Sequence, residues 1–239
     1  MRRPTTVLAF AAVLAALVAC SQKPAPTAPG AAAPAAAAVA AQKTAPAGDY
    51  VTDPAHSSLT FTIDHLGFSH WTGRFEKWSA NLHFDPKDVS KMSVSATIDA
   101  RSLAHDNPPA GFLAELTGPH FLDADNYPQM SFHSTKVVQT GPDSADVTGD
   151  LTLHGVTRPV TLKIVYNGGY PGMSLDPKAR VGFSAHGSLN RSDFGVSMGL
   201  PPAGTTFGVG DRVDIAIETE LVGPPLVAAQ GASATPPKP

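Results

Sequence analysis

The stretch SLTFTID, residues 58–64, decides the fold class because polar and apolar side chains alternate strictly along it. Leu59, Phe61 and Ile63 are apolar, and the residues between them are serine, threonine or aspartate. This period of two is that of a β-strand with one apolar face and one solvated face. The sequence therefore predicts an all-β domain of about eight strands, because seven further runs are typical of strands: 75–84, 92–98, 130–137, 145–153, 160–166, 179–189 and 213–218.

The segments between these runs carry turn residues, and only one of them predicts a helix. Turns are expected at Asp85-Pro86, Gly141-Pro142-Asp143 and Asn167-Gly168-Gly169, with a tight hairpin at His154-Gly155. Residues 104–128 form a longer, irregular insertion of the kind that often covers a site. Within it, residues 111–118 predict a short helix whose apolar face includes Phe112 and Leu116.

An antiparallel sheet with one apolar face must hide that face, either by closing into a barrel or by packing as a sandwich. Spacing alone leaves both open, and it favours a solid core over a cavity. An eight-stranded barrel has an interior wide enough for side chains or for one small ligand.

Cys20 is the only cysteine of the chain and follows a 12-residue apolar run, residues 7–18, that is preceded by Arg2 and Arg3. A bilayer span needs roughly 20 apolar residues, so the run is typical of a signal peptide. Residues 17–20, LVAC, resemble the lipobox of bacterial lipoproteins, whose cysteine is lipidated. Ser21 after the cysteine is consistent with the outer membrane. An ordinary secretory signal is the alternative, and both imply export.

Composition divides the 239 residues into four parts. A signal peptide is expected over 1–19, a disordered Ala/Pro-rich tether over 20–48, one globular domain over 49–223 and a disordered tail over 224–239. The net charge of −3, without a cluster of basic residues, argues against nucleic acid as a partner. No nucleophile elbow, P-loop or dinucleotide fingerprint occurs, so catalysis has little support.

Ten short motifs along the domain resemble those of the YceI-like family of bacterial periplasmic proteins. They include DPAHS at 53–57, GRF at 73–75, GDLTLHGVT at 149–157 and NRSDFG at 190–195. The resemblance implies a lipocalin-like antiparallel barrel whose long apolar cavity binds a polyisoprenoid, such as an isoprenoid quinone or a polyprenyl phosphate. It also implies a periplasmic location and no catalytic centre. Residues 112–121 depart from the family pattern, with Glu115 where relatives carry a histidine.

The resemblance turns part of the apolar set into candidates for a cavity wall, although which of them line it is open. The candidates are Phe61, Ile63, Phe84, Val94, Ile98, Phe112, Leu116, Phe132, Leu162, Ile164, Phe183, Ile215 and Ile217.

Arginine suits phosphate geometry, so Arg74, Arg101 and Arg191 are candidates for a ligand head group. A simpler interpretation of Arg191 is an ion pair with Asp193 that fixes the following bend. The nine histidines are scattered without metal-ligand spacing, so no metal site and no cofactor is predicted.

The leading hypothesis is a lipid-anchored envelope protein that carries or sequesters an isoprenoid lipid reversibly. The alternatives are a barrel enzyme with a small apolar substrate and an envelope protein–protein adaptor. A homodimer is compatible with each.

Overall fold

The computed structural model describes residues 42–226. The predicted signal peptide, Cys20, and most of the predicted tether and tail lie outside the described residues. Between them the chain forms β1 (Gly48–Thr52), β2 (Ser58–His65), β3 (Ser69–Phe75), β4 (Trp78–Phe84), β5 (Ser93–Asp99), β6 (Leu103–Ala104), α1 (Phe112–Thr117), β7 (Gln129–Gly141), β8 (Ser144–Leu153), β9 (Val156–Tyr170), β10 (Lys178–Asn190) and β11 (Val209–Pro225).

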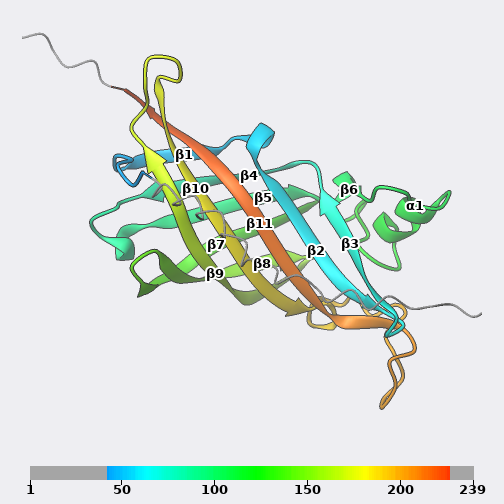
Figure 1. Cartoon of the computed structure of the whole chain (residues 1–239). Coiled ribbons are helices and arrows are strands. Elements are labelled where there is room, and N and C mark those ends of the chain that lie inside the picture. The colour runs from blue at the N-terminus through cyan, green and yellow to red at the C-terminus, as the bar shows by residue number, and fades with distance from the viewer. Residues whose placement is uncertain (1–41, 227–239) are drawn as a thin grey trace, which may run out of the picture. The chain divides into compact units, whose positions relative to one another are not determined.

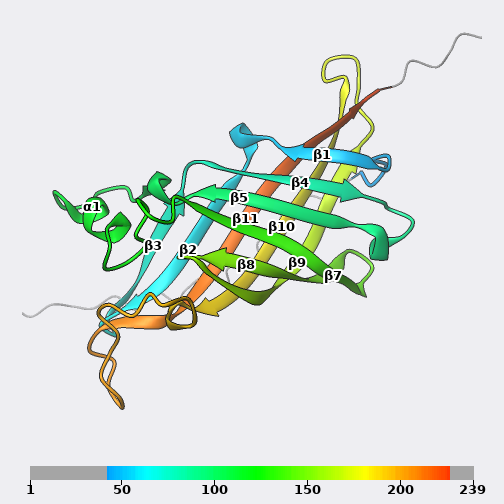
Figure 2. The same cartoon turned by 180° about the vertical axis from the view of Figure 1, so that it is seen from behind.

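The strands form one closed antiparallel barrel (Figures 1 and 2). The order of the strands in the sheet is β1-β4-β5-β7-β8-β9-β10-β11-β2-β3-β6, and the last strand, β11, returns to pair with β1. β11 pairs with β10 along one edge, and along the other with β1 at Val222 and with β2 at Val213. Closure pairs β11 on both edges, which is how such a sheet reduces the number of exposed backbone donors and acceptors.

The eleven strand segments amount to eight barrel strands, because three of the eight are bent and each consists of two segments: β1 with β2, β3 with β4, and β5 with β6. β1 and β2 are separated only by a 3-10 turn at Pro54–His56, and they pair in turn with β4 and β3. β5 and β6 extend the same pattern beyond a second 3-10 turn, Ala100–Ser102. The predicted number of strands is thereby confirmed, and of the two architectures left open the barrel is the one formed.

The barrel has two ends, here called the strap end and the lid end. The strap end holds residues 42–47, the β4–β5 connection and the β7–β8 turn. The lid end holds the β2–β3 turn, residues 105–128 with α1, the β8–β9 turn and the loop 195–208 between β10 and β11.

Residues 42–47 correct the prediction of a disordered tether up to residue 48. The Thr44 amide donates to the carbonyl of Gly169, and the Gly169 amide donates to the carbonyl of Gln42. Ala45 is buried against Tyr50 and Phe84. The segment is fixed by backbone hydrogen bonds to β9, which the Ala/Pro-rich composition does not reveal. We call it the strap.

Two predicted turns have opposite outcomes. His154 and Gly155 join β8 to β9 with φ angles of +52° and +74°, as a two-residue hairpin turn requires, so that prediction is confirmed. The turn predicted at residues 167–169 is wrong. β9 continues through it, and the pairing with β10 shifts register opposite Phe183. Glycine is needed at Gly169 because a Cβ there would lie 2.5 Å from the carbonyl of Arg180.

The only α-helix in the described part of the chain is the predicted one. α1 begins after Gly111, whose φ is +79°, and ends before Gly118. Leu113 and Leu116 pack on a buried cluster that includes Phe75 and Leu103. With six residues, α1 is far shorter than the roughly 20 that a bilayer span needs, and no other helix of residues 42–226 qualifies as one.

Candidate functional site

A cavity of about 580 Å³ occupies the barrel interior and has lining residues at both ends. Its volume falls in the range of small-molecule sites, roughly 300–1,000 Å³. The wall is almost wholly apolar, because the inward-facing residues of every barrel strand are aliphatic or aromatic over most of their length. A site of this kind suits an elongated apolar molecule.

The structure places all thirteen apolar candidates on the cavity wall: Phe61, Ile63, Phe84, Val94, Ile98, Phe112, Leu116, Phe132, Leu162, Ile164, Phe183, Ile215 and Ile217. That these residues contact a ligand stays a prediction.

Sequence reasoning missed several aromatic wall residues. Trp71 lies in β3, a segment that was not predicted as a strand, and its ring packs on Phe112 and His105. Trp78 lies in the predicted run 75–84 and shares the inward alternation of Ala80, Leu82 and the candidate Phe84. Tyr166 was assigned to the apolar face of its strand but was not named as a candidate. Applying strict alternation to every residue of each predicted strand would have identified Trp78 and Tyr166 as wall residues.

The strap end of the cavity carries most of its polar side chains. Gln139, Asp143 and Ser144 line the wall there, and the strap's Lys43 forms an ion pair with Asp143. Burial, assisted by the nearby Asp143 charge, raises the pKa of the Tyr166 phenol. This end therefore presents hydrogen-bonding groups beside an apolar interior.

Two of the three arginines predicted as head-group ligands lie off the cavity wall. Arg74 donates to Asp106 (Nη1–Oδ1 2.6 Å), and Arg101 pairs with Asp125 at 3.4 Å. Both side chains are exposed, and neither residue lines the cavity. Their geometry gives the head-group interpretation no support.

Arg191 lines the cavity at the lid end but is committed to the backbone. It is 5% exposed, and its guanidinium donates to the carbonyls of Val196, Met198, Val209 and Gly210 at 2.8–3.0 Å. Burial lowers its pKa, against the opposing charge of nearby Asp211. The predicted ion pair with Asp193 is wrong, because Arg191 begins a 3-10 turn and clips the following loop through its carbonyls.

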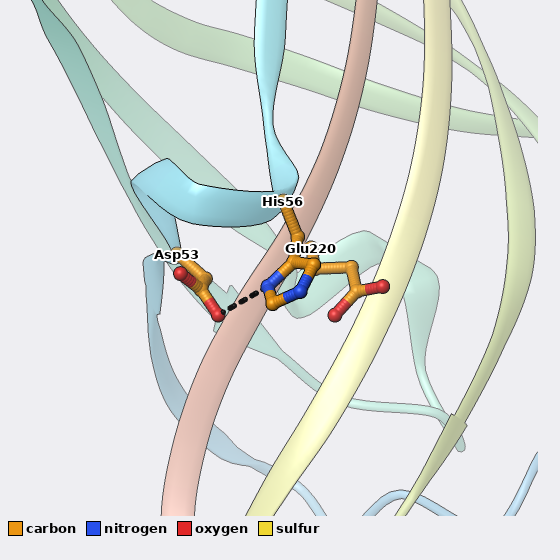
Figure 3. Close-up of side chains that lie close together, drawn as sticks. All are labelled: Asp53, His56 and Glu220. Atoms are coloured by element: carbon orange, nitrogen blue, oxygen red, sulfur yellow. Dashed lines mark hydrogen bonds and ion pairs between the residues drawn. The ribbon is translucent and has the colours of Figure 1, made fainter.

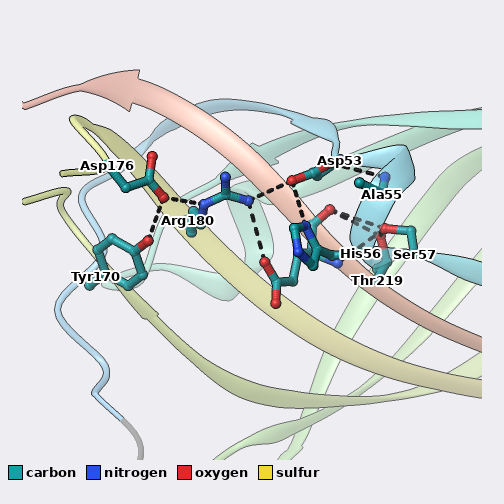
Figure 4. Close-up of polar contacts among 9 residues, drawn as sticks. Asp53, Ala55, His56, Ser57, Tyr170, Asp176, Arg180 and Thr219 are labelled. Carbon is teal, nitrogen blue, oxygen red and sulfur yellow. Dashed lines mark hydrogen bonds and ion pairs between the residues drawn. The ribbon is translucent and has the colours of Figure 1, made fainter.

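A second polar cluster lies around Arg180 and includes residues of β9, β10 and β11 (Figure 4). Arg180 donates to Asp176 (Nε–Oδ2 2.5 Å), to Asp53 (Nη1–Oδ2 2.6 Å) and to Glu220 (Nη1–Oε2 3.3 Å). Tyr170 donates to the same Asp176 oxygen at 2.6 Å. These contacts tie the entry of β2 to the strap ends of β10 and β11, which is a structural role.

Three ligand-type side chains of this cluster lie close enough together to hold a metal ion: Asp53, His56 and Glu220 (Figure 3). Arg180 already binds both carboxylates, and His56 Nδ1 bonds Asp53 Oδ2 at 2.9 Å. The positive charge that the two carboxylates require is therefore supplied by a guanidinium, and the arrangement does not call for a cation.

Asp53 makes the stability of the domain depend on pH. The Arg180 guanidinium, followed by His56, holds the pKa of the Asp53 carboxyl well below its usual range. A lowered folded-state pKa stabilises the fold above the ordinary aspartate pKa and loses that contribution in acid. We expect Asp53→Asn to be less stable than wild type near about pH 6, and the difference to shrink steadily as the pH falls below about 4. Urea unfolding across this range measures it. A difference that stays constant with pH would contradict the assignment.

The described residues thus form a closed antiparallel barrel around an apolar cavity. The YceI-like domain model matches residues 50–221, and the chain belongs to the YceI-like family. A UPF0312 protein of Vibrio cholerae serotype O1 is 36% identical over 182 residues, which are 74% of this chain and 89% of that relative. One from Vibrio parahaemolyticus is 39% identical over 156 residues, 64% and 79% of the two chains.

Solved structures agree with this assignment. The crystal structure of Burkholderia cenocepacia BcnA matches with a TM-score of 0.60 and 27% identity, covering 71% of this chain and 98% of BcnA. A polyisoprenoid-binding domain from Saccharophagus degradans, implicated in plant cell wall breakdown, matches with a TM-score of 0.53 over 74% and 99% of the chains. Its identity of 13% shows a common fold alone.

Proposed function

We propose that this protein binds an isoprenoid lipid in the barrel cavity and acts in the bacterial cell envelope as a reversible carrier or sequestering protein. The observation that carries the proposal is the apolar cavity of about 580 Å³ that extends through the barrel. Membership of the YceI-like family supports it, as does the polyisoprenoid-binding domain that shares the fold.

Transfer energies favour exchange over permanent capture. Each five-carbon isoprene unit gains ~4 kcal/mol on leaving water, at ~0.8 kcal/mol per buried carbon. The bilayer is about as apolar as the cavity, so transfer from membrane to protein lies near zero in free energy. A ligand can therefore move in both directions, which is what a carrier requires.

The wall favours a neutral head group over a phosphate. Arg191 is the only lysine or arginine among the described residues that line the cavity, and four backbone carbonyls already occupy it. Gln139 and Ser144 at the strap end are neutral, and the Asp143 carboxylate there is paired with Lys43. Of the two ligand types that the family implies, an isoprenoid quinone fits these groups better than a polyprenyl phosphate.

The experiment that tests the function is identification of what the purified protein carries. Native mass spectrometry should show an adduct, and solvent extraction should release an isoprenoid with a neutral head group. The protein should also acquire the adduct after incubation with quinone-containing vesicles. A protein that stays free of lipid through both treatments would refute the proposal, whereas a released polyprenyl phosphate would refute only the head-group preference.

We also propose that Cys20 carries the lipid anchor and that the protein resides in the periplasm, attached to the outer membrane. Cys20→Ala is expected to abolish incorporation of radiolabelled palmitate and to leave a soluble protein or an uncleaved precursor. Membrane fractionation and autoradiography read this out. Labelling of the variant at the wild-type level would exclude Cys20 as the acceptor.

The enzyme and adaptor hypotheses have less support. An enzyme needs a reactive group with an acid or base beside it inside the cavity. In the described wall, Tyr166 and Arg191 have shifted pKa values, and Arg191 is tied to carbonyls. An adaptor would be favoured by a solid interior, and this barrel is hollow.

A further inference from the structure

Three large apolar side chains project from the lid end of the barrel. Phe68 at the β2–β3 turn is 81% exposed, and Phe207 and Met198 in the loop between β10 and β11 are 73% and 46% exposed. We call these three residues the apolar rim. The loop extends beyond the barrel beside the β2–β3 turn in both views (Figures 1 and 2). Such exposure is costly in water unless something covers it.

The two tips are held together. The amide of Leu66 donates to the carbonyl of Gly208 at 2.8 Å, and Gly67 lies against Thr206. Arg191 fixes the base of the loop through the carbonyls of Met198 and Val209. The apolar rim is therefore presented by a braced pair of loops, and its geometry is set by the fold.

The loop that carries Met198 and Phe207 is uncharged, whereas Asp64, His65 and His70 flank Phe68 on the β2–β3 turn. Residues 195–210 contain no Asp, Glu, Lys, Arg or His. The ion pairs of the lid end, Arg74–Asp106 and Arg101–Asp125, involve residues outside this loop. An uncharged loop with exposed apolar side chains matches the apolar interior and the interface of a bilayer.

The rim also borders the cavity. Ser69 follows Phe68 directly, and Val196 and Val209 lie two residues from Met198 and Phe207; all three neighbours line the cavity wall. We infer that the apolar rim inserts into the surface of a lipid bilayer, so that the lid end of the cavity opens towards the membrane. The inference rests on the proposed function for its purpose, but its geometry stands without it.

A second copy of the chain is a poorer occupant. Aromatic side chains bury roughly 150–250 Å² each, so three partly exposed residues offer at most roughly 500 Å². A stable dimer needs about 800 Å² from each partner.

The chain between Cys20 and the strap is long enough for the rim at the lid end to reach the membrane to which Cys20 is proposed to be anchored. The 22 positions from Cys20 to Gln42 provide a contour of up to ~68 Å. β11, with 17 residues, spans ~56 Å along the strand and less along a tilted barrel axis.

Tryptophan scanning of the full chain tests the inference. Phe207→Trp is compared with Leu175→Trp, because Leu175 is 96% exposed in the β9–β10 loop, away from the lid end, and provides a matched control. Each is mixed with phosphatidylcholine vesicles containing acyl-brominated lipid, and the emission of Trp71 and Trp78 is subtracted. We expect brominated lipid to reduce the fluorescence of the introduced tryptophan in Phe207→Trp at least twofold. Aqueous iodide should quench the introduced tryptophan only in Leu175→Trp.

Three outcomes would overturn the inference: quenching of both introduced tryptophans by iodide alone, equal quenching of both by brominated lipid, or a blue-shifted Phe207→Trp emission without vesicles together with a dimer in light scattering.

A second variant separates this inference from the proposed function. Phe68→Ser combined with Phe207→Ser should slow uptake of quinone from vesicles about tenfold, while the amount bound at equilibrium stays unchanged. An unchanged uptake rate would contradict docking. If wild type takes up no quinone at all, the proposed function fails, and the tryptophan quenching still decides whether the rim contacts a bilayer.

Discussion

Ile164→Glu is expected to abolish co-purification of lipid. Ile164 lies midway along β9 and faces the cavity between Leu162 and Tyr166. An unpaired carboxylate in an apolar wall keeps its hydration or takes up a proton, and either response disfavours an adjacent hydrocarbon chain. We expect the adduct in native mass spectra to fall at least a hundredfold, because burying such a charge costs several kcal/mol.

The neighbouring residue provides the control. Val165 is 45% exposed on the outer face of the same strand, so Val165→Glu adds the same charge without entering the cavity. It should retain the wild-type adduct. Thermal unfolding of both variants verifies that the barrel is intact. Equal lipid content in folded Ile164→Glu and Val165→Glu would show that the cavity is not the binding site.

Arg191→Met is expected to lower the free energy of unfolding by ~3–5 kcal/mol, the range observed when one partner of a buried charged network is removed. Methionine fills much of the volume but leaves the carbonyls of Val196, Met198, Val209 and Gly210 without their donor. Arg191→Lys should restore only part of the loss, since one ammonium cannot reach carbonyls on both sides of the loop.

Urea unfolding measures the effect, with Arg158→Met as the control. Arg158 is exposed and makes one long contact, 3.4 Å to the carbonyl of Asp193, so its loss should cost under about 0.5 kcal/mol. Lipid content distinguishes the structural role from a head-group role. If Arg191→Met were as stable as wild type but had lost its ligand, Arg191 would bind the head group after all.

Alternation of side chains predicted part of each of the eight barrel strands and much of the apolar cavity wall, although it missed β1 and β3. The pattern is strong because each inward position, such as Phe61 or Ile215, contacts an apolar interior while its neighbours contact water. Whether that interior is filled or hollow depends on side-chain volumes around the whole ring. Spacing carries no such information, and the cavity was expected only from the family resemblance.

Contacts between distant segments could not be predicted from one sequence. The Arg180 cluster joins Asp53 to a residue 127 positions away. The partners of Arg191 are backbone carbonyls, which every residue carries, so residue identity does not reveal them. The strap was misjudged for the same reason, because its stability comes from the backbone of Gly169. The motif Asn167-Gly168-Gly169 is typical of a turn, but in the structure its glycines leave room for the strap and allow the register shift between β9 and β10.

The strap has a practical consequence for anyone preparing this domain. A recombinant fragment that starts where the family match starts, at residue 50, would delete the backbone oxygen of Pro46, to which the Tyr50 hydroxyl donates at 2.7 Å. Tyr50 is wholly buried, and burial, with a contribution from Tyr166, raises its pKa to about 12. An orphaned hydroxyl there costs about 1–3 kcal/mol. A recombinant fragment should therefore begin before Gln42, because a shorter one would underestimate the stability of the domain.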